Sequence, residues 1–319
     1  MSSDRRRLDS VASMYDARSE RYDDNDVHVR QACDYLSWAD LKPGENVLDL
    51  ACGTGLVALG AKNLVGPSGR VVGVDISEGM LGVARRKAAT MGFLEEDSVL
   101  FVKHDISDLT GLLETVAIPA QGPQGPPSQG GRSLDAHAHA HARFDVITCA
   151  AALILLEDPV AAVRNWRETV LAPVGGRVVT DVQTKDANIV MNVFADIARD
   201  LRELDHDQNK VNVSILWDAK RWQSKDALAE VMRQAGLTVE RVFETEPYAR
   251  QTYKCEQAGE LFDKAVDKEM FRSFGAEDIR DTARDLFIRR FQDLAAGSTG
   301  STGSVEEETR FWVIVASTP

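Results

Sequence analysis

Three aspartates end three successive apolar segments of the chain. The segments are residues 47–55 (VLDLACGTG), 71–77 (VVGVDIS) and 99–106 (VLFVKHDI), and the acids are Asp49, Asp75 and Asp105. Short β-branched and aliphatic runs that alternate with helical patterns indicate a parallel sheet with crossover helices. In such sheets, ligands bind beyond the carboxyl ends of the strands. We therefore expect the three carboxylates and the glycine turn to line one end of a sheet, around a ligand that contains a nucleoside.

The glycine turn by itself is compatible with two classes of ligand. Gly53, Gly55 and Ala58 satisfy the GxGxxA pattern of dinucleotide-binding folds, which is weak on its own. In a dehydrogenase, the glycines hold a pyrophosphate at a helix N-terminus, and a nearby anion opposes this. Asp49 precedes Gly53 closely, and its carboxylate would repel a diphosphate but accept a hydrogen bond from an ammonium group. S-adenosylmethionine carries an ammonium and a sulfonium but no phosphate, so the sequence favours this cofactor.

The other two acids complete a site for S-adenosylmethionine. Asp75 is placed to accept hydrogen bonds from both ribose hydroxyls, and Asp105 from the exocyclic amine of adenine, with Ile106 packed on the ring. The remaining candidate cofactor-binding residues are Tyr22, Ala51, Cys52, Gly53, Gly55, Ile76, Met80 and Ala150. The chain also lacks the Tyr-x-x-x-Lys pair with which a short-chain dehydrogenase would transfer hydride.

This arrangement resembles the class I S-adenosylmethionine-dependent methyltransferases. VLDLACGTG is similar to their first motif, Asp75 to their ribose-binding acid, HDI to their adenine-binding segment and FDVITCAAAL to their fourth-strand motif. The YDARSERYD opening, the short glycine motif and VGVDISEGML are most similar to the ubiquinone/menaquinone-biosynthesis-like branch. The resemblance implies a leading helix, here carrying Tyr15 and Tyr22, that covers the cofactor.

The whole chain is expected to form one domain. Seven predicted strands alternate with helices, which indicates an α/β fold: a Rossmann-like three-layer sandwich with a mostly parallel seven-stranded sheet, an antiparallel last strand and an inserted helical cap. The expected core covers residues 41–246 and 309–319, and the expected cap covers residues 11–38, 186–216 and 256–296. One amphipathic helical pattern runs through residues 11–36, and Ser77 is placed to cap a later helix. No boundary indicates a second self-contained core.

Two low-complexity segments are expected to be disordered loops, residues 119–143 and 297–308. The first contains PAQGPQGPPSQGG and HAHAHAR, with almost no large apolar residue, and the second is rich in Gly, Ser and Thr. His137, His139 and His141 alternate as in a metal-binding tract. A solvated low-complexity loop explains the same composition more simply, and we assign no metal.

The composition of the chain limits the partners and the cellular location that we expect for the protein. A net charge of -13 argues against nucleic acid, because phosphate binding needs clustered Lys and Arg. No apolar run reaches the roughly 18 to 20 residues of a membrane-spanning helix, and the MSSDRRRL start lacks the apolar core of a secretory signal. The four cysteines form no CxxC pair, which is typical of reduced thiols. We expect a soluble cytoplasmic protein, and the sequence makes no prediction of oligomeric state.

The methyl acceptor is expected to be a small, largely apolar molecule. The fourth strand lacks the Asn/Asp-Pro-Pro-aromatic signature used on planar nitrogens, and it continues as AAALILLEDP where quinone methyltransferases typically have polar residues. The apolar stripes of the cap helices are explained by ordinary packing as well as by substrate contact. We expect O- or C-methylation, for example of a polyketide-like phenol or carboxylic acid.

No catalytic base can be assigned from the sequence. Methyl transfer needs a base only if the acceptor arrives protonated. His206, between Asp205 and Asp207, and Glu157 are the weak candidates, although a solvated helix end and a surface position explain them as well. His104 is expected to point away from the acceptor. Two other functions stay open: an S-adenosylmethionine-binding protein with a regulatory or non-methylating role, and a nicotinamide oxidoreductase.

Overall fold

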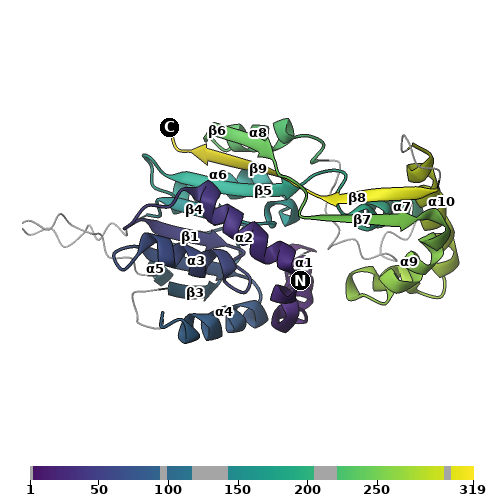
Figure 1. Ribbon diagram of the computed structural model, residues 1–319, viewed down its shortest axis with the longest axis horizontal. Coiled ribbons are helices and arrows are strands. Elements are labelled where there is room, and N and C mark those ends of the chain that lie inside the picture. The colour runs from purple at the N-terminus through teal and green to yellow at the C-terminus, as the bar shows by residue number, and fades with distance from the viewer. Residues whose placement is uncertain (1–2, 94–98, 117–142, 205–220, 298–302) are drawn as a thin grey trace, which may run out of the picture.

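The computed structural model describes residues 3–93, 99–116, 143–204, 221–297 and 303–319. Its main sheet has seven strands in the order β3-β2-β1-β4-β5-β9-β6 (Figure 1). Their bounds are β1 Asn46–Leu50, β2 Arg70–Asp75, β3 Val99–Lys103, β4 Val146–Cys149, β5 Arg177–Gln183, β6 Thr238–Glu244 and β9 Phe311–Ser317. The strands from β1 to β5 pair in parallel, whereas β9 is antiparallel to both β5 and β6. The predicted fold class, with its antiparallel last strand, is confirmed.

Helices cover both faces of this sheet and make it the middle layer of a sandwich. One face packs against α2 (Asp26–Ala39), α3 (Leu56–Val65) and α4 (Glu78–Thr90); the other packs against α5 (Leu112–Val116), α6 (Pro159–Thr169) and α8 (Lys225–Gln234). Val71 and Val72 face opposite layers, yet neither has exposed surface. Strands that are buried on both faces need continuous apolar runs, which explains the segments that mark them in the sequence.

The predicted single helix over residues 11–36 is wrong. The segment forms α1 (Ser3–Asp16), a 3-10 helix η1 (Ser19–Asp24) and α2. Asn25 has extended backbone angles and its side chain accepts a hydrogen bond from the Val27 N–H, so it starts α2 as an N-cap. The charged run DARSERYDDND between α1 and α2 offers few apolar side chains to hold a continuous helix on the core. The predicted Ser77 cap is confirmed, since its hydroxyl accepts from the Met80 N–H.

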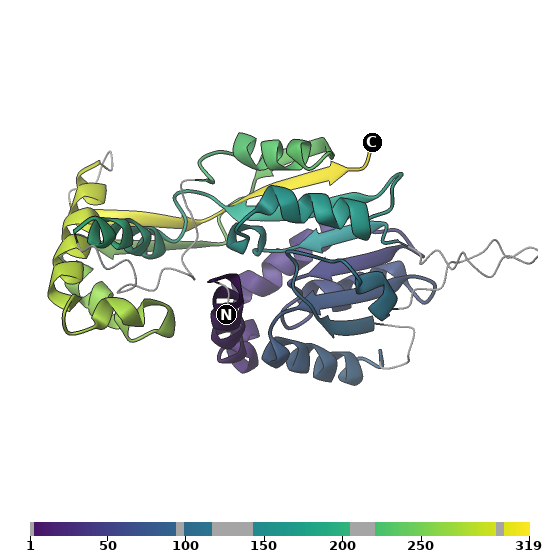
Figure 2. The same ribbon diagram turned by 180° about the vertical axis from the view of Figure 1, so that it is seen from behind.

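The inserted cap has a buried apolar cluster of its own. It combines α7 (Ile189–Leu204), α9 (Ala258–Val266), η4 (Glu269–Gly275) and α10 (Arg280–Gly297). The Phe194 ring stacks on Phe271, with ring centroids 4.2 Å apart, and also contacts Phe287. Figure 2 shows these helices grouped to one side of the main sheet. The cap therefore packs around its own centre, and the assignment of the whole chain to one domain stays a prediction.

A two-stranded antiparallel ribbon joins the cap to the core. It pairs β7 (Ala249–Lys254) with β8 (Ser304–Thr309), with Tyr253 opposite Val305. The expected disorder of residues 297–308 is therefore wrong for residues 304–308, because Val305 is buried in the cap and β7 supplies the backbone partners. Residues 298–302, and almost all of the predicted loop over 119–143, lie outside the described residues.

Gly73 in β2 offers a test of how tightly the core is packed below the site. A Cβ atom there would lie 2.6 Å from Phe101 Cδ1 and 2.9 Å from Cys52 Sγ. In α4, a Cβ on Gly82 would meet only the end of Arg86, at 3.7 Å. We expect Gly73→Ala to lower the free energy of unfolding by about 1–3 kcal/mol through overpacking, and Gly82→Ala to raise it by about 0.5–1 kcal/mol. Urea titrations followed by circular dichroism measure both, and equal stability of the two variants would contradict the packing described here.

Candidate functional site

The glycine turn between β1 and α3 depends on left-handed backbone angles. Ala51, Gly53 and Gly55 have φ of 52°, 55° and 81°. A Cβ on Gly55 would lie 3.1 Å from Ala84 Cβ, whereas nothing lies within 4 Å of a Cβ position on Gly53. Gly55 is thus required for both its angle and its close packing, and Gly53 leaves open space beside the backbone.

Asp49 lies beneath this turn. Only 1% of the residue is exposed, and its two carboxylate oxygens accept from the Thr148 hydroxyl at 2.7 Å and from the Ala58 N–H at 3.1 Å. Ala58 belongs to the first turn of α3, so Asp49 caps that helix from the neighbouring strand. Burial raises the pKa of Asp49 to about 7, although both hydrogen bonds act in the opposite direction. Its expected contact with an ammonium group stays a prediction.

Asp75 connects two turns at the end of β2. One carboxylate oxygen accepts from the Gly53 N–H at 2.8 Å and the other from the Ser77 N–H at 2.9 Å. The residue is 7% exposed, and burial raises its pKa. The charge of Asp75 also contributes to the raised pKa of Asp49. Asp75 therefore holds the backbone of the glycine turn at Gly53, and Asp49 holds the start of the helix that follows it.

The third predicted acid lies at the same end of the sheet. The His104 N–H donates to the backbone carbonyl of Asp75 at 3.0 Å, so the end of β3 adjoins the end of β2. The Asp105 side chain accepts from the Ser107 N–H at 2.9 Å, and the Ile106 carbonyl accepts from Trp166 Nε1 at 2.6 Å. The structure thus brings Asp49, Asp75 and Asp105 to successive strand ends, as their spacing predicts.

The other predicted cofactor residues border these turns. Met80 is 1% exposed and Cys52 is 8% exposed, whereas Ile76, Ile106 and Ala150 are half-buried. Burial and the charges of Asp75 and Asp49 raise the pKa of the Cys52 thiol, which keeps it neutral. The roles assigned to these residues remain predictions.

Tyr15 and Tyr22 are half-buried tyrosines of α1 and η1. Burial raises the pKa of both phenols, and the Asp75 charge contributes to each shift. The Arg18 guanidinium lies 5.7 Å from the Tyr15 ring centroid and 5.9 Å from that of Tyr22. Arg18 thus joins the end of α1 to η1, and the role of this segment as a cover over the cofactor stays a prediction.

Two acids missed in the sequence fasten this cover. Asp16 accepts from the Ser77 hydroxyl at 2.5 Å and from the Gly79 N–H at 2.8 Å, at the start of α4. Asp23 accepts from the Thr54 hydroxyl at 2.6 Å and forms an ion pair with Lys87. A usable signal was present, because each acid directly follows one of the two tyrosines in YDARSERYD.

A further buried acid, also missed, supports the ends of β4 and β5. Asp181 has no exposed surface and accepts from Gln31 Nε2 at 2.7 Å and from the Ala151 N–H at 2.8 Å. Ala151, just beyond β4, has a φ of 54°. Burial raises the pKa of Asp181 to about 7. The available signal was one charged residue inside the apolar run VVTDVQ.

The weak catalytic candidates receive no support from the described residues. Glu157 is exposed, and its backbone carbonyl accepts from Arg221 at 2.8 Å. His206 and its acidic neighbours lie outside the described residues, as do His137, His139 and His141. Where the structure describes the chain, no group of three His, Cys, Asp or Glu side chains is arranged to hold a metal ion. The same part of the chain contains no helix with the length and apolarity needed to span a bilayer.

Comparison with known proteins decides the family. The model of the methyltransferase domain matches residues 41–236. The chain belongs to the methyltransferase domain family. The resemblance to class I S-adenosylmethionine-dependent enzymes of the ubiquinone/menaquinone branch is confirmed, and S-adenosylmethionine is the cofactor of that family.

Individual relatives match this methyltransferase over limited stretches. A demethylmenaquinone methyltransferase of Symbiobacterium thermophilum is 39% identical over 26% of this chain and 32% of its own length. Nocamycin O-methyltransferase of Saccharothrix syringae is 37% identical over 27% of this chain and 29% of its own length. The chain thus spans about a third of the curated relatives that it matches. A Bacillus halodurans C-125 protein assigned to the methyltransferases has a TM-score of 0.51 and 17% identity, over 90% of this chain and 98% of its own, which shows the shared fold.

The residues of the turn fit such a cofactor chemically. Asp49 and Asp75 are buried carboxyls near the glycine turn. Lys87 is engaged by Asp23 and the Thr54 carbonyl, and Arg18 lies against the rings of Tyr15 and Tyr22. A site of this composition favours a cationic ligand over a diphosphate. The open space beside Gly53 gives such a ligand access to the backbone.

The buried carboxyl of Asp181 should make stability depend on pH. Its folded-state pKa of about 7 lies above the ordinary value of 3.8, so the folded protein binds more protons than the unfolded chain between these values. Stability should therefore fall as pH rises from about 4 to 7. Asp181→Asn removes this titration and should become more stable relative to wild type over that range, by up to about 4 kcal/mol.

Urea titrations at several pH values measure this difference. Glu157→Gln, which changes an exposed carboxyl, serves as the control and should leave the pH profile unchanged. A constant difference in free energy between Asp181→Asn and wild type from pH 4 to 7 would show that Asp181 is ionised throughout.

Proposed function

We propose that this protein transfers the methyl group of S-adenosylmethionine to a small, largely apolar acceptor by O- or C-methylation. The observation that carries the proposal is a glycine turn that the buried Asp75 holds at Gly53, followed by a helix that the buried Asp49 caps at Ala58, in a methyltransferase domain. The names of the matched relatives include methyltransferases of a quinone precursor and of nocamycin, which supports a small-molecule acceptor.

The cofactor supplies an activated methyl group, because its carbon is bonded to a positively charged sulfur. The residues of the chain bind the cofactor and the acceptor, orient them toward one another and exclude water. Asp75 keeps lone pairs free after accepting from Gly53 and Ser77, since each carboxylate oxygen has two, and these suit ribose hydroxyls. Tyr15, Tyr22 and the Arg18 side chain above them limit the access of water.

The acceptor is expected beside the ends of β4 and β5. In the sheet, β2 and β3 lie on one side of β1, and β4 and β5 lie on the other. The nucleoside part of the cofactor belongs at the ends of β2 and β3, which leaves the ends of β4 and β5 for the acceptor. Leu153 and Ile154, just beyond β4, are buried, and the Ala151 turn before them is held by Asp181. This end of the sheet is therefore apolar, which suits an acceptor with little charge.

A cytoplasmic location is part of this proposal. All four cysteines are free thiols, and Cys52 and Cys149 are buried. Buried free thiols are common where glutathione and thioredoxin keep cysteines reduced.

Substitution of Asp75 tests the cofactor site. Asp75→Asn should weaken the binding of S-adenosylhomocysteine by about 10- to 100-fold, because hydrogen bonds to a charged group contribute about 1.5–3 kcal/mol. Titration calorimetry measures the affinity, with NAD as a second ligand that should not bind. Asp145→Asn is the matched control, since Asp145 also accepts from a backbone N–H but lies at the opposite end of the sheet. Equal affinity in wild type and Asp75→Asn would contradict the assignment.

The acceptor class is tested with methyl-labelled cofactor. Wild-type protein is incubated with small phenols, enolisable ketones and carboxylic acids, and in parallel with protein and RNA extracts. We expect label in the small organic fraction, with release of an equal amount of S-adenosylhomocysteine, and much less of both with Asp75→Asn. Label in macromolecules alone would contradict a small acceptor. Cofactor binding without any release of S-adenosylhomocysteine would favour a non-methylating role.

A further inference from the structure

Asp181 is a buried acid to which the proposed function gives no role. It directly follows Thr180, which pairs with Cys149, so it lies at the carboxyl ends of β4 and β5. Its carboxyl has no exposed surface and accepts from Gln31 Nε2 and from the Ala151 N–H, both neutral donors. Within the described ranges, no lysine or arginine acts on its pKa. A buried carboxylate without a counter-ion is costly, so a cationic ligand nearby would stabilise it.

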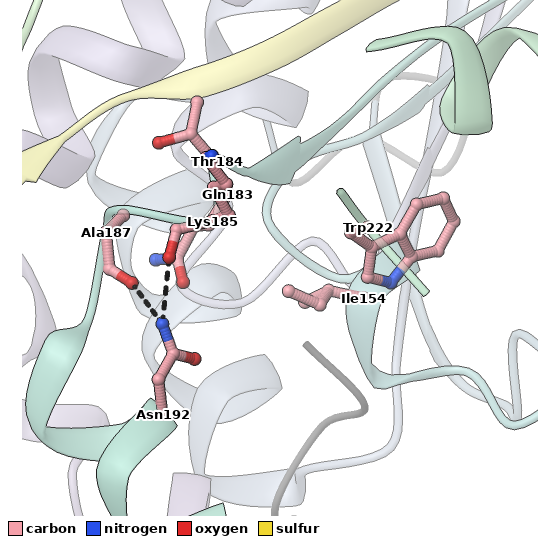
Figure 3. Close-up of a pocket in the computed structure, with 7 residues that line it drawn as sticks. All are labelled: Ile154, Gln183, Thr184, Lys185, Ala187, Asn192 and Trp222. Carbon is pink, nitrogen blue, oxygen red and sulfur yellow. Dashed lines mark hydrogen bonds between the residues drawn. The ribbon is translucent and has the colours of Figure 1, made fainter. Parts of the chain in front are cut away.

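Asp181 is the described group in this region that changes its charge near neutral pH. Tyr35 on α2, Cys149 on β4 and Tyr248 before β7 face it, and burial together with the charge of Asp181 raises the pKa of each. These three groups therefore stay neutral, whereas burial raises the pKa of Asp181 only to about 7. The hollow past the end of β5 has room for about one water molecule, and Asp181 is not among the residues that line it (Figure 3). Solvent thus screens the charge of Asp181 little.

The turn that Asp181 holds adjoins the glycine turn. Leu50 and Cys149 are the last paired residues of β1 and β4, so the two turns begin side by side. Ala151 in one turn and Ala51 in the other have φ of 54° and 52°. A left-handed alanine costs energy, and such residues persist at ligand sites where the surrounding structure holds them. The turn after β4 is therefore a candidate wall of the cofactor site, with the Asp181 carboxyl directly behind it.

The proposed function brings a positive charge to this turn. The ribose belongs at the end of β2 and the acceptor beyond β4 and β5, so the methyl group must point toward the end of β4. The sulfur that carries the methyl group is a cation. When the methyl group leaves, the electron pair of the broken bond stays on sulfur, and S-adenosylhomocysteine has a neutral thioether there. The two molecules thus differ in charge at the part of the cofactor that faces this turn.

We propose that the Asp181 carboxylate selects S-adenosylmethionine over S-adenosylhomocysteine by attracting the positively charged sulfur across the turn after β4. The inference rests on the proposed methyltransferase function and adds a specificity-determining residue to it. Asp181 has no exposed surface, so it acts through space and does not touch the cofactor. Asp49 is also buried but is expected at the ammonium group, which both molecules carry. A site with this preference exchanges its product for fresh substrate more readily.

Calorimetric titration of the whole chain with each of the two ligands tests the proposal. Asp181→Asn keeps an oxygen for the Ala151 N–H, and rotation of the Gln31 amide keeps the second hydrogen bond, so the variant removes charge but not contacts. We expect it to bind S-adenosylmethionine about tenfold more weakly than wild type at about pH 7.5, and S-adenosylhomocysteine within about twofold. Asp49→Asn is matched in burial and should weaken both ligands alike. Equal weakening of both ligands in Asp181→Asn, or of neither, would overturn the proposal.

The pH dependence of the two affinities gives a readout that a merely structural role of Asp181 would not change. In wild type, the preference for S-adenosylmethionine should rise between about pH 5.5 and 7.5, because Asp181 loses its proton over this range. In Asp181→Asn this rise should be absent, and any effect of ligand ionisation is common to both proteins. An identical rise in both proteins, or none in wild type, would contradict the inference alone. If neither ligand binds to wild type, the proposed function fails, and this inference with it.

Discussion

The candidate site depends on one interaction, the buried carboxylate of Asp75 bonded to the N–H groups of Gly53 and Ser77. A buried carboxylate requires donors, and backbone donors are available only where a turn leaves them unpaired. The acid therefore dictates the path of both turns, and the left-handed angle of Gly53 is the conformation that presents its N–H. Asp49 acts similarly on Ala58 in α3. Acids on two strands, β1 and β2, thus fix the conformation of the glycine turn and of the helix start after it without a ligand.

Hydrogen bonds and an ion pair also join segments that are distant in the sequence at the glycine turn. Thr54 in the glycine turn donates to Asp23, and Lys87 of α4 donates to the Thr54 carbonyl and pairs with Asp23. Asp16 bonds to the start of α4 beside Ser77. The cover is thereby attached to the very turns that Asp75 holds. Any movement that opens the cover must break hydrogen bonds at the glycine turn, so cover and turn form one unit energetically.

The sequence predicts well what local patterns determine. The strand ends, the Ser77 cap and the three acids follow from apolar runs and spacing, because strand and helix periods are local. Partners across the chain do not follow: Gln31 and Asp181 are 150 residues apart, and Asp23 and Thr54 are 31 apart. The β7–β8 ribbon was missed because its polar strand SVEEET carries a single buried apolar side chain, Val305. Whether such a polar strand forms depends on its pairing with a strand that is distant in the sequence.

The junction between core and cap contrasts with the glycine turn. Around the glycine turn, each buried carboxyl has its protein donors, which favours a rigid frame. At the junction, Thr184 Oγ1 and Asn192 Oδ1 are buried and have no hydrogen-bond partner among the described residues. Asn188 opens α7 with a φ of 55°, a backbone angle that costs energy, and Glu307 from β8 caps its first N–H. The polar groups around the glycine turn are thus satisfied by the turn itself and its neighbours, whereas α7 begins on a strained residue and depends on a distant strand to complete its first turn.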